Sequence, residues 1–316
     1  MNILLLTNCM KQPDDTDDST DVVFSFAREW AAVGHRVVVV HNENKFPLIL
    51  YKLPRFVYSE LKKRQNITIP SIASRQVLKR KQDGVDIIRM PIFKIFPHVG
   101  YFDRQYNNHA EAIKEYLASL SFRPDVITGH WLEPQLRLVN DLGEYYSAKK
   151  GFVFHSELPK KLSERYLKYI QNLDFLFFRS KSTRDKMVGM YPFLNPKKTG
   201  VCFSGVPAAY ADVKYEKQEW KTDGVLKVIF VGRLIAYKRV DATLKALAQA
   251  FPKGKFHFTI VGDGTAKDEL VKLVDEMGIK DKVSFCGRVP RDEAQQKLRE
   301  ADCFVMISEN EVFGLV

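Results

Sequence analysis

Short apolar runs alternate with amphipathic stretches along the whole chain. Ile3–Leu6 is continuously apolar, which is typical of a strand buried on both faces of a parallel sheet. In Asp21–Val33 the apolar residues recur at helical spacing, and Gly34 follows as a natural helix stop. Arg36–Val40 is rich in β-branched residues and predicts a second strand. This strand–helix–strand order predicts a doubly wound α/β fold.

The alternation continues to about residue 205. Further strands are predicted at Asp86–Met90, Asp125–Thr128, Phe152–Phe154, Phe175–Phe178 and Thr199–Phe203, with helices at Asn108–Leu120, Glu164–Leu173 and Thr183–Tyr191. Residues 208–224 are polar and aperiodic, and we interpret them as a linker. Residues 1–207 are therefore expected to form one Rossmann-like domain.

A second series of strands and helices follows the linker. Its predicted strands are Leu226–Val231, Phe256–Val261, Lys282–Cys286 and Cys303–Ile307, and its helices are Ala242–Phe251, Ala266–Met277 and Arg291–Glu300. Residues 225–316 are thus expected to form a second Rossmann-like domain, which is incomplete because its pattern stops between elements.

Net charge narrows the choice of partners. The formal charge of +11 suits nucleic acid, an anionic membrane surface or phosphorylated small molecules. The four cysteines lack the spacing of zinc ligands, and reduced cytosolic thiols are expected. No signal peptide and no membrane-spanning run is predicted, so the expected location is the cytoplasm.

Ligands of open parallel sheets bind beyond the carboxyl ends of the strands. In the segment VGRLIAYK, Gly232 permits a sharp turn after a strand, and Arg233 follows directly. Lys238 precedes a helix whose free N–H groups also favour anions. These two cations predict a diphosphate site, although solvated surface cations would show the same pattern. Gly262-Asp263-Gly264, by contrast, is interpreted as a structural turn.

In the first domain, the residues after the strands include two histidines. The candidates are Asn8, His130, His155 and Ser180. A single histidine more often serves packing, but two at the edge of one sheet favour the lining of a site. Neither has a cysteine or carboxylate at metal-ligand spacing, so no metal site is expected.

The segment ADCFVMISENEVFG carries the strongest signal. A predicted strand leads to Glu311 in a loop, and Phe313-Gly314 begins a predicted helix. A carboxylate can accept hydrogen bonds from two adjacent sugar hydroxyls, and the following backbone N–H groups can bind phosphate or hydroxyl oxygens. A helix-capping glutamate would give the same local pattern.

Taken in order, these segments resemble glycosyltransferase family 4, which has the GT-B fold of two Rossmann-like domains. VGRLIAYKRVD resembles the family's donor-phosphate motif, and ADCFVMISENEVFGLV resembles the start of its E-x7-E motif. IVGDG and VSFCGRVP resemble the strand–loop units between them. GHRVVVV, VFHSELP and CFSGVPAAY resemble segments of the first domain and the domain linker.

The resemblance implies retaining, metal-independent transfer of a sugar from a nucleotide-sugar donor to a glycan or lipid-linked acceptor, with no further cofactor. It implies that Arg233 and Lys238 stabilise the diphosphate and that the leaving phosphate takes the acceptor's proton. His155 and Glu311 would bind the transferred sugar as the catalytic pair. The other implied contacts are Arg288 and Val289 near the base, the amides of Phe313, Gly314 and Leu315 beside Glu311, and His130 on the acceptor side.

Three features depart from the family pattern. Five aspartates lie between Asp14 and Asp21, where the family carries a glycine pair. Arg239 occupies a position usually held by glycine. The second glutamate of the motif would fall after Val316, so a truncated chain with weak donor binding and negligible transfer is expected.

Two other functions stay open at this point. One is a nucleotide-sugar epimerase of the same fold, although no acid–base carboxylates can be named for it. The other is a non-catalytic, truncated GT-B scaffold. A dehydrogenase is disfavoured because the first strand–helix turns lack GxGxxG, and nucleic-acid binding is disfavoured because no basic stripe marks a known module.

Residues 45–81 form the most basic stretch of the chain. They contain ten Lys and Arg residues and one acid, Glu60, with aromatic and aliphatic residues interspersed. This pattern predicts peripheral contact with the anionic inner membrane face, near a lipid-linked acceptor. A solvated basic face is the alternative. With the family resemblance, it suggests a role in cell-surface polysaccharide synthesis.

Overall fold

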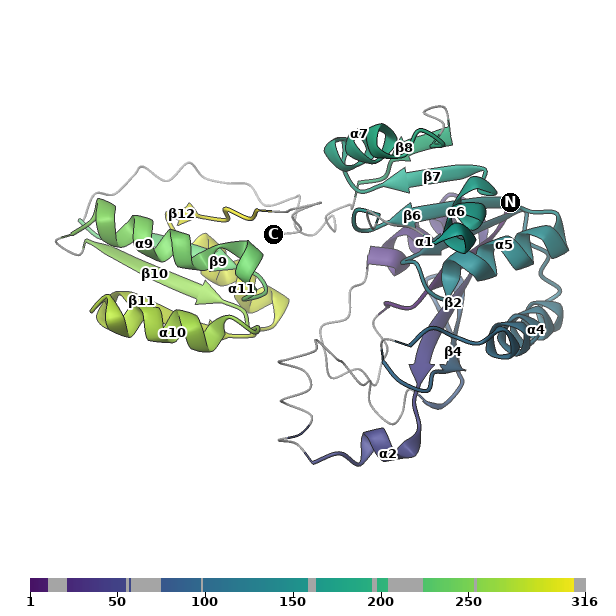
Figure 1. The fold of residues 1–316 in the computed structure, drawn as a ribbon, viewed down its shortest axis with the longest axis horizontal. Helices are drawn as coiled ribbons and strands as arrows, with labels where there is room; N and C mark the ends of the chain where they lie inside the picture. The colour runs from purple at the N-terminus through teal and green to yellow at the C-terminus, as the bar shows by residue number, and fades with distance from the viewer. Residues whose placement is uncertain are drawn as a thin grey trace. The chain divides into compact units, whose positions relative to one another are not determined.

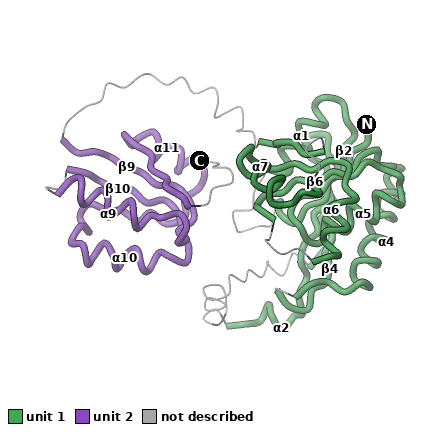
Figure 2. The backbone as a smooth tube through the Cα atoms, turned by 45° about the horizontal axis from the view of Figure 1, so that its top comes forward, with its two compact units in different colours: residues 1–205 green, residues 206–316 purple. Residues whose placement is uncertain are grey.

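The computed structural model describes residues 1–10, 22–54, 57, 75–97, 99–158, 163–194, 198–203, 224–252 and 255–309. The chain divides into two compact units, residues 1–205 and 206–316 (Figure 2). Each unit is a largely parallel sheet with helices packed against it (Figure 1). The predicted α/β class with two Rossmann-like folds is therefore confirmed. Most of the predicted linker lies outside the described residues.

The sheet of unit 1 has eight strands in the order β3-β4-β2-β1-β5-β6-β7-β8. The strands are β1 (Asn2–Thr7), β2 (Arg36–Lys45), β3 (Leu78–Gln82), β4 (Val85–Phe93), β5 (Val126–His130), β6 (Lys149–Phe154), β7 (Phe175–Phe178) and β8 (Thr199–Val201). Neighbouring strands are parallel except β3 and β4, which are antiparallel.

Sequence analysis missed β3 because its residues LKRKQ are mostly charged and lie at the edge of the sheet. The turn into β4 carries the signal that could have identified it. Asp83 and Gly84 have φ angles of 49° and 79°, as a two-residue hairpin turn requires.

Helices cover both faces of this sheet, which explains the continuous apolar run in β1. Leu4 and Leu6 belong to a core with α4 and α5, whereas Ile3 and Leu5 pack in a second core with α1. The helices are α1 (Val22–Ala32), α2 (Leu48–Tyr51), α4 (Asp103–Ser119), α5 (Gln135–Tyr146), α6 (Glu164–Gln171) and α7 (Lys181–Met190).

The sheet of unit 2 has four parallel strands in the order β11-β10-β9-β12. They are β9 (Leu226–Val231), β10 (Phe256–Val261), β11 (Val283–Gly287) and β12 (Cys303–Phe304). The helices are α9 (Val240–Ala250), α10 (Lys267–Glu276) and α11 (Arg291–Arg299), with short 3-10 turns η3 (Ala236–Lys238) and η4 (Lys280–Lys282). Phe230 and Phe258 are fully buried at the centre of its core.

Candidate functional site

In unit 2, backbone hydrogen bonds join the loop after β10 to the loop after β9 and to the last residue of β11. Gly262 N donates to Gly287 O at 2.7 Å, and Leu234 N donates to Asp263 O at 3.0 Å. These bonds hold the ends of three neighbouring strands together at the carboxyl edge of the sheet, where ligands of such sheets bind.

Two glycines permit this close approach. A Cβ atom on Gly262 would lie 1.8 Å from the carbonyl oxygen of Gly232, and one on Gly264 would lie 2.2 Å from that of Leu234. Gly262 also has a φ of 137°, which L-residues rarely adopt. The Gly-Asp-Gly segment therefore has the structural role that its sequence suggested.

Arg233 and Lys238, the predicted phosphate-binding cations, lie in the loop between β9 and α9. Arg233 is exposed and forms no ion pair within the described part of the chain. Lys238 is half-buried, with its Nζ atom 4.0 Å from Met306 Sδ and 5.5 Å from the centre of the Tyr237 ring. The Arg233 guanidinium is thus available to an anion, while Lys238 lies against the segment after β12.

Arg239 has the left-handed conformation that glycine adopts most readily, with a φ of 50°. Its guanidinium forms ion pairs with Glu309 and with Asp241, the second at 3.4 Å between Nε and Oδ1. The position where the resembled family usually has glycine is therefore held by an arginine in a left-handed turn, and its side chain links this turn to the end of the described chain.

The sheet order places the other predicted donor residues along the same edge. Arg288 is exposed and Val289 is half-buried, directly after β11. Glu309 N donates to Tyr237 O at 2.9 Å, so the chain leading toward Glu311 runs beside the loop of Lys238. The remaining predicted residues, Glu311, Phe313, Gly314 and Leu315, lie outside the described residues.

In unit 1, the two predicted histidines are in contact. His130 ends β5, His155 follows β6, and the His130 Nδ1 and His155 Nε2 atoms are 2.9 Å apart. Trp131 stacks on the His155 ring, with a centroid distance of 4.0 Å and an angle of 5°. His130 was predicted on the acceptor side, but it has no exposed surface and its Nδ1 faces His155 instead of solvent.

The environment of the pair selects a tautomer. His130 Nε2 is buried and has no hydrogen-bond partner among the described residues. A buried N–H without a partner costs more than a buried lone pair, so the His130 proton belongs on Nδ1. His130 then donates to His155 Nε2, which places the proton of neutral His155 on its Nδ1. His155 can therefore donate one hydrogen bond to a ligand.

Both histidines are neutral at pH 7. Burial lowers the pKa of His155 to about 3, with a further contribution from the positive charge of Arg179. Burial also lowers the pKa of His130 well below its usual value, assisted by His155 and Arg179. A neutral pair can donate and accept hydrogen bonds without adding positive charge near that of Arg179.

Sequence reasoning selected Ser180 after β7 and missed its neighbour Arg179. The Ser180 side chain caps α7 by accepting a hydrogen bond from Thr183 N at 3.1 Å. Arg179 is buried and acts electrostatically on both histidines. Its position directly after the strand FLFF is the signal that could have identified it.

Comparisons with known proteins show which family the second unit matches and which solved structures resemble the chain. Residues 213–316 match the family described as Glycosyl transferases group 1. This match spans nearly the whole of the second unit, residues 206–316. Lipopolysaccharide outer core galactosyltransferase WaaB has a similar structure, with a TM-score of 0.63 and 14% identity over 100% of this chain and 76% of that one. The chain therefore has the GT-B fold.

Two further proteins are similar to this chain. One was solved with bound ligands, and the name of the other refers to a lipid. Anabaena HepE, solved with UDP and glucose, superposes with a TM-score of 0.58 and 14% identity over 99% of this chain and 76% of that one. Alpha-monoglucosyldiacylglycerol synthase of Streptococcus pneumoniae is 21% identical over 83% of this chain and 63% of its own length. In other curated relatives, the match spans 23% to 33% of their length.

Proposed function

We propose that this GT-B chain transfers a sugar from a nucleotide-sugar donor and binds the donor diphosphate on the loop of Arg233 and Lys238. The observation that carries this proposal is the exposed Arg233 on hydrogen-bonded loops at the carboxyl edge of a glycosyltransferase domain. Its structural neighbour HepE was solved with UDP and with UDP-glucose, which supports a nucleotide diphosphate as the ligand.

The proposed reaction retains the anomeric configuration and needs no metal ion. Negative charge develops on the diphosphate as its bond to the sugar breaks, and cations aimed at that charge lower the barrier. Arg233 and Lys238 take this role, while the leaving phosphate accepts the proton of the attacking hydroxyl. His155, with its proton on Nδ1, donates a hydrogen bond to the transferred sugar. Glu311 accepts hydrogen bonds from the hydroxyls of that sugar.

Replacing Arg233 or Lys238 by alanine is expected to weaken UDP binding about ten- to a hundredfold, because a charge-assisted hydrogen bond contributes roughly 1.5–3 kcal/mol. Calorimetric titration of the full chain with UDP measures this loss. Lys272→Ala on α10 is the matched control, since that side chain is 78% exposed and pairs with Glu276. Unchanged affinity in both variants would show that the diphosphate binds elsewhere.

We further propose that the acceptor is carried by a lipid and that unit 1 contacts an anionic membrane surface. None of the described helices is both long and apolar enough to cross a bilayer. Two segments at the carboxyl ends of β2 and β4 instead expose apolar side chains, and Lys94 N joins them by donating to Lys45 O at 2.9 Å. The exposed residues are Leu48, Ile49, Phe93, Ile95, Phe96, Val99 and Phe102.

Basic side chains accompany these apolar ones, as contact with anionic lipid requires. Lys45 and Lys52 flank the first segment, which belongs to the basic stretch 45–81, and Lys94 lies within the second segment. Only part of that stretch lies within the described residues. The names of two similar proteins, a lipopolysaccharide galactosyltransferase and a diacylglycerol glycoside synthase, agree with an acceptor of this kind.

Ile49→Ser is expected to weaken binding to anionic vesicles about tenfold, because a buried aliphatic side chain contributes roughly 1.5–3 kcal/mol. Val33→Ser is the matched control, since both side chains are 72% exposed and Val33 lies at the opposite edge of the sheet. Sedimentation with phosphatidylglycerol vesicles measures the effect, and added salt should also reduce binding. Equal binding of the two variants would exclude this membrane-facing surface.

A further inference from the structure

A cavity of about 260 Å³ lies in unit 1, separate from the histidine pair. The N-terminal turns of α4, α5 and α6 and the loop after β5 surround it. Its lining residues are Gly100, Tyr101, Tyr106, Leu132, Glu133, Arg137, Ser163, Arg165, Tyr166 and Tyr169. Four tyrosines and two arginines among ten residues are an unusual lining for a packing defect.

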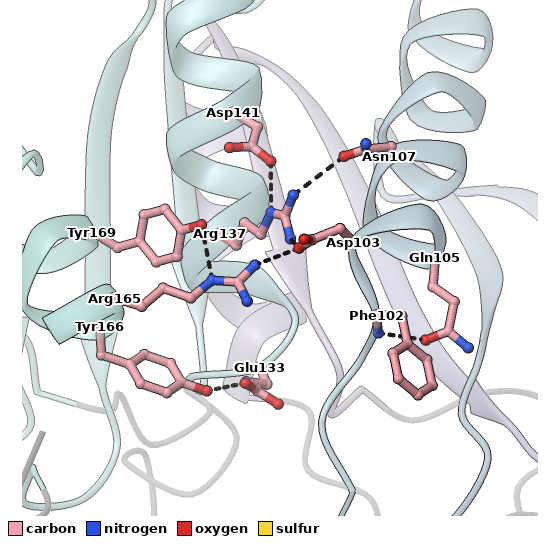
Figure 3. Close-up of polar contacts among 10 residues, drawn as sticks. All are labelled: Phe102, Asp103, Gln105, Asn107, Glu133, Arg137, Asp141, Arg165, Tyr166 and Tyr169. Carbon is pink, nitrogen blue, oxygen red and sulfur yellow. Dashed lines mark hydrogen bonds and ion pairs between the residues drawn. The ribbon is translucent and has the colours of Figure 1, made fainter. Parts of the chain in front are cut away.

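Side-chain contacts fix the geometry of the wall (Figure 3). Asp103 Oδ1 bridges the two arginines and accepts from Arg165 Nη2 at 2.9 Å. Arg137 also donates from Nε to Asp141 Oδ2 at 3.2 Å and lies 4.5 Å from the centre of the Tyr106 ring. The cavity is thus lined by side chains already held in position by bonds within the protein.

Two polar groups of the wall keep unused hydrogen-bonding capacity. Arg165 donates from Nε to Tyr169 OH at 3.3 Å and from Nη2 to Asp103, but its Nη1 has no partner among the described residues. Glu133 Oε1 accepts from the Tyr166 hydroxyl, and Oε2 has no partner within the same set. The cavity therefore offers a donor and an acceptor together, as adjacent sugar hydroxyls require.

The wall carries charges of both signs. Arg137 and Arg165 face Asp103, Asp141 and Glu133. Burial raises the pKa of Glu133, whereas Lys94 and Arg165 act to lower it. A phosphate or carboxylate ligand would meet these carboxylates, and a cationic ligand would meet the arginines. An uncharged polyhydroxylated ligand avoids both conflicts.

The size and shape of the cavity restrict the class of ligand further. Small-molecule sites usually measure about 300–1,000 Å³, so this cavity suits a ligand no larger than a single sugar ring. Tyr101 and Tyr106 contact each other edge to face at 5.3 Å and are almost fully buried. Such fixed aromatic rings provide apolar surface for the C–H face of a pyranose.

The loop after β5 links the cavity to the histidine pair. Trp131 stacks on His155, and the next two residues, Leu132 and Glu133, line the cavity. We propose that this cavity binds one uncharged sugar residue of the acceptor, held between Glu133, Arg165 and the tyrosines. The role as acceptor subsite rests on the proposed transferase function, whereas sugar binding itself does not.

Saturation-transfer NMR of the full chain tests the proposal with methyl glucoside, methyl galactoside and methyl mannoside as probes. Methyl glucuronide and glucose 6-phosphate are the charged counterparts. At least one uncharged glycoside should bind, and Glu133→Gln and Arg165→Gln should each weaken it by roughly tenfold. Arg184→Gln is the matched control, because Arg184 forms its exposed ion pair with Asp185 on α7.

UDP titration of the same samples separates the two proposals. Glycoside binding without UDP binding would leave the cavity assignment intact and overturn the transferase proposal. UDP binding without binding of any uncharged glycoside would overturn the cavity assignment alone. Tighter binding of the charged sugars, or equal binding by the cavity variants and Arg184→Gln, would also overturn it. Thermal unfolding of each variant establishes that the fold is kept.

Discussion

Replacing Gly262 by alanine is expected to destabilise unit 2 by roughly 3–5 kcal/mol, which combines the cost of overpacking with that of a left-handed backbone. The new Cβ would meet the Gly232 carbonyl oxygen at 1.8 Å, and a backbone atom cannot rotate away as a side chain can. The loops after β9 and β10 must therefore separate. Hydrogen exchange of β10 and α9, measured by mass spectrometry, reports this loss for unit 2 by itself.

Gly278→Ala separates steric overlap from backbone conformation. Gly278 has a φ of 64°, but a Cβ there would meet nothing within 4 Å. This variant should cost only about 1–2 kcal/mol, which is the penalty of the left-handed conformation. If Gly262→Ala costs no more than Gly278→Ala, the loops that carry Arg233 and Asp263 are less tightly joined than their hydrogen bonds indicate.

Lowering the pH from 7 to 5 is expected to destabilise unit 1 by about 2 kcal/mol for each deeply buried histidine. Burial lowers the pKa of His109 to about 4 and that of His155 to about 3, and it lowers that of His130 further still. Below pH 6.5 the unfolded chain binds protons that the folded chain does not. Stability is therefore present above about pH 6.5 and is lost as the pH falls toward 4.

His109→Gln provides the test, because glutamine can still donate to Asn42 Oδ1, which lies 2.8 Å from His109 Nε2. Urea unfolding followed by tryptophan fluorescence should show a pH-dependent loss about 2 kcal/mol smaller than in the wild type. His35→Gln in the turn between α1 and β2 should lose as much stability as the wild type. Equal losses in His109→Gln and the wild type would assign the acid sensitivity to other groups.

Much of the fold could be predicted because a strand that is buried on both faces of a parallel sheet has a continuous run of apolar residues. The predicted bounds of β7, β9 and β10 are identical to those in the structure. The strand predicted at Cys303–Ile307 is assigned only at Cys303–Phe304, since β12 pairs with β9 through those two residues. The charged edge strand β3 has no such apolar run, because an edge strand buries little of its side-chain surface.

The candidate donor loop also followed from local rules, since a glycine and two cations after a strand are visible in one segment. The bonds that hold this loop in place were not visible. They connect Gly262 to Gly287 and Leu234 to Asp263, and only the sheet order brings these residues together. The left-handed turn at Arg239 was likewise hidden, because arginine gives no sign of it.

The sequence by itself determined the α/β class, the alternation of elements and the polar residues that follow each strand, because these depend on periodicity and near neighbours. Only the tertiary structure decided which of them meet. His130 and His155 are 25 residues apart and share one hydrogen bond. Arg137, which lines the cavity, forms an ion pair with Asp103, 34 residues away. Such contacts arise from strand order and helix packing, which no local pattern records.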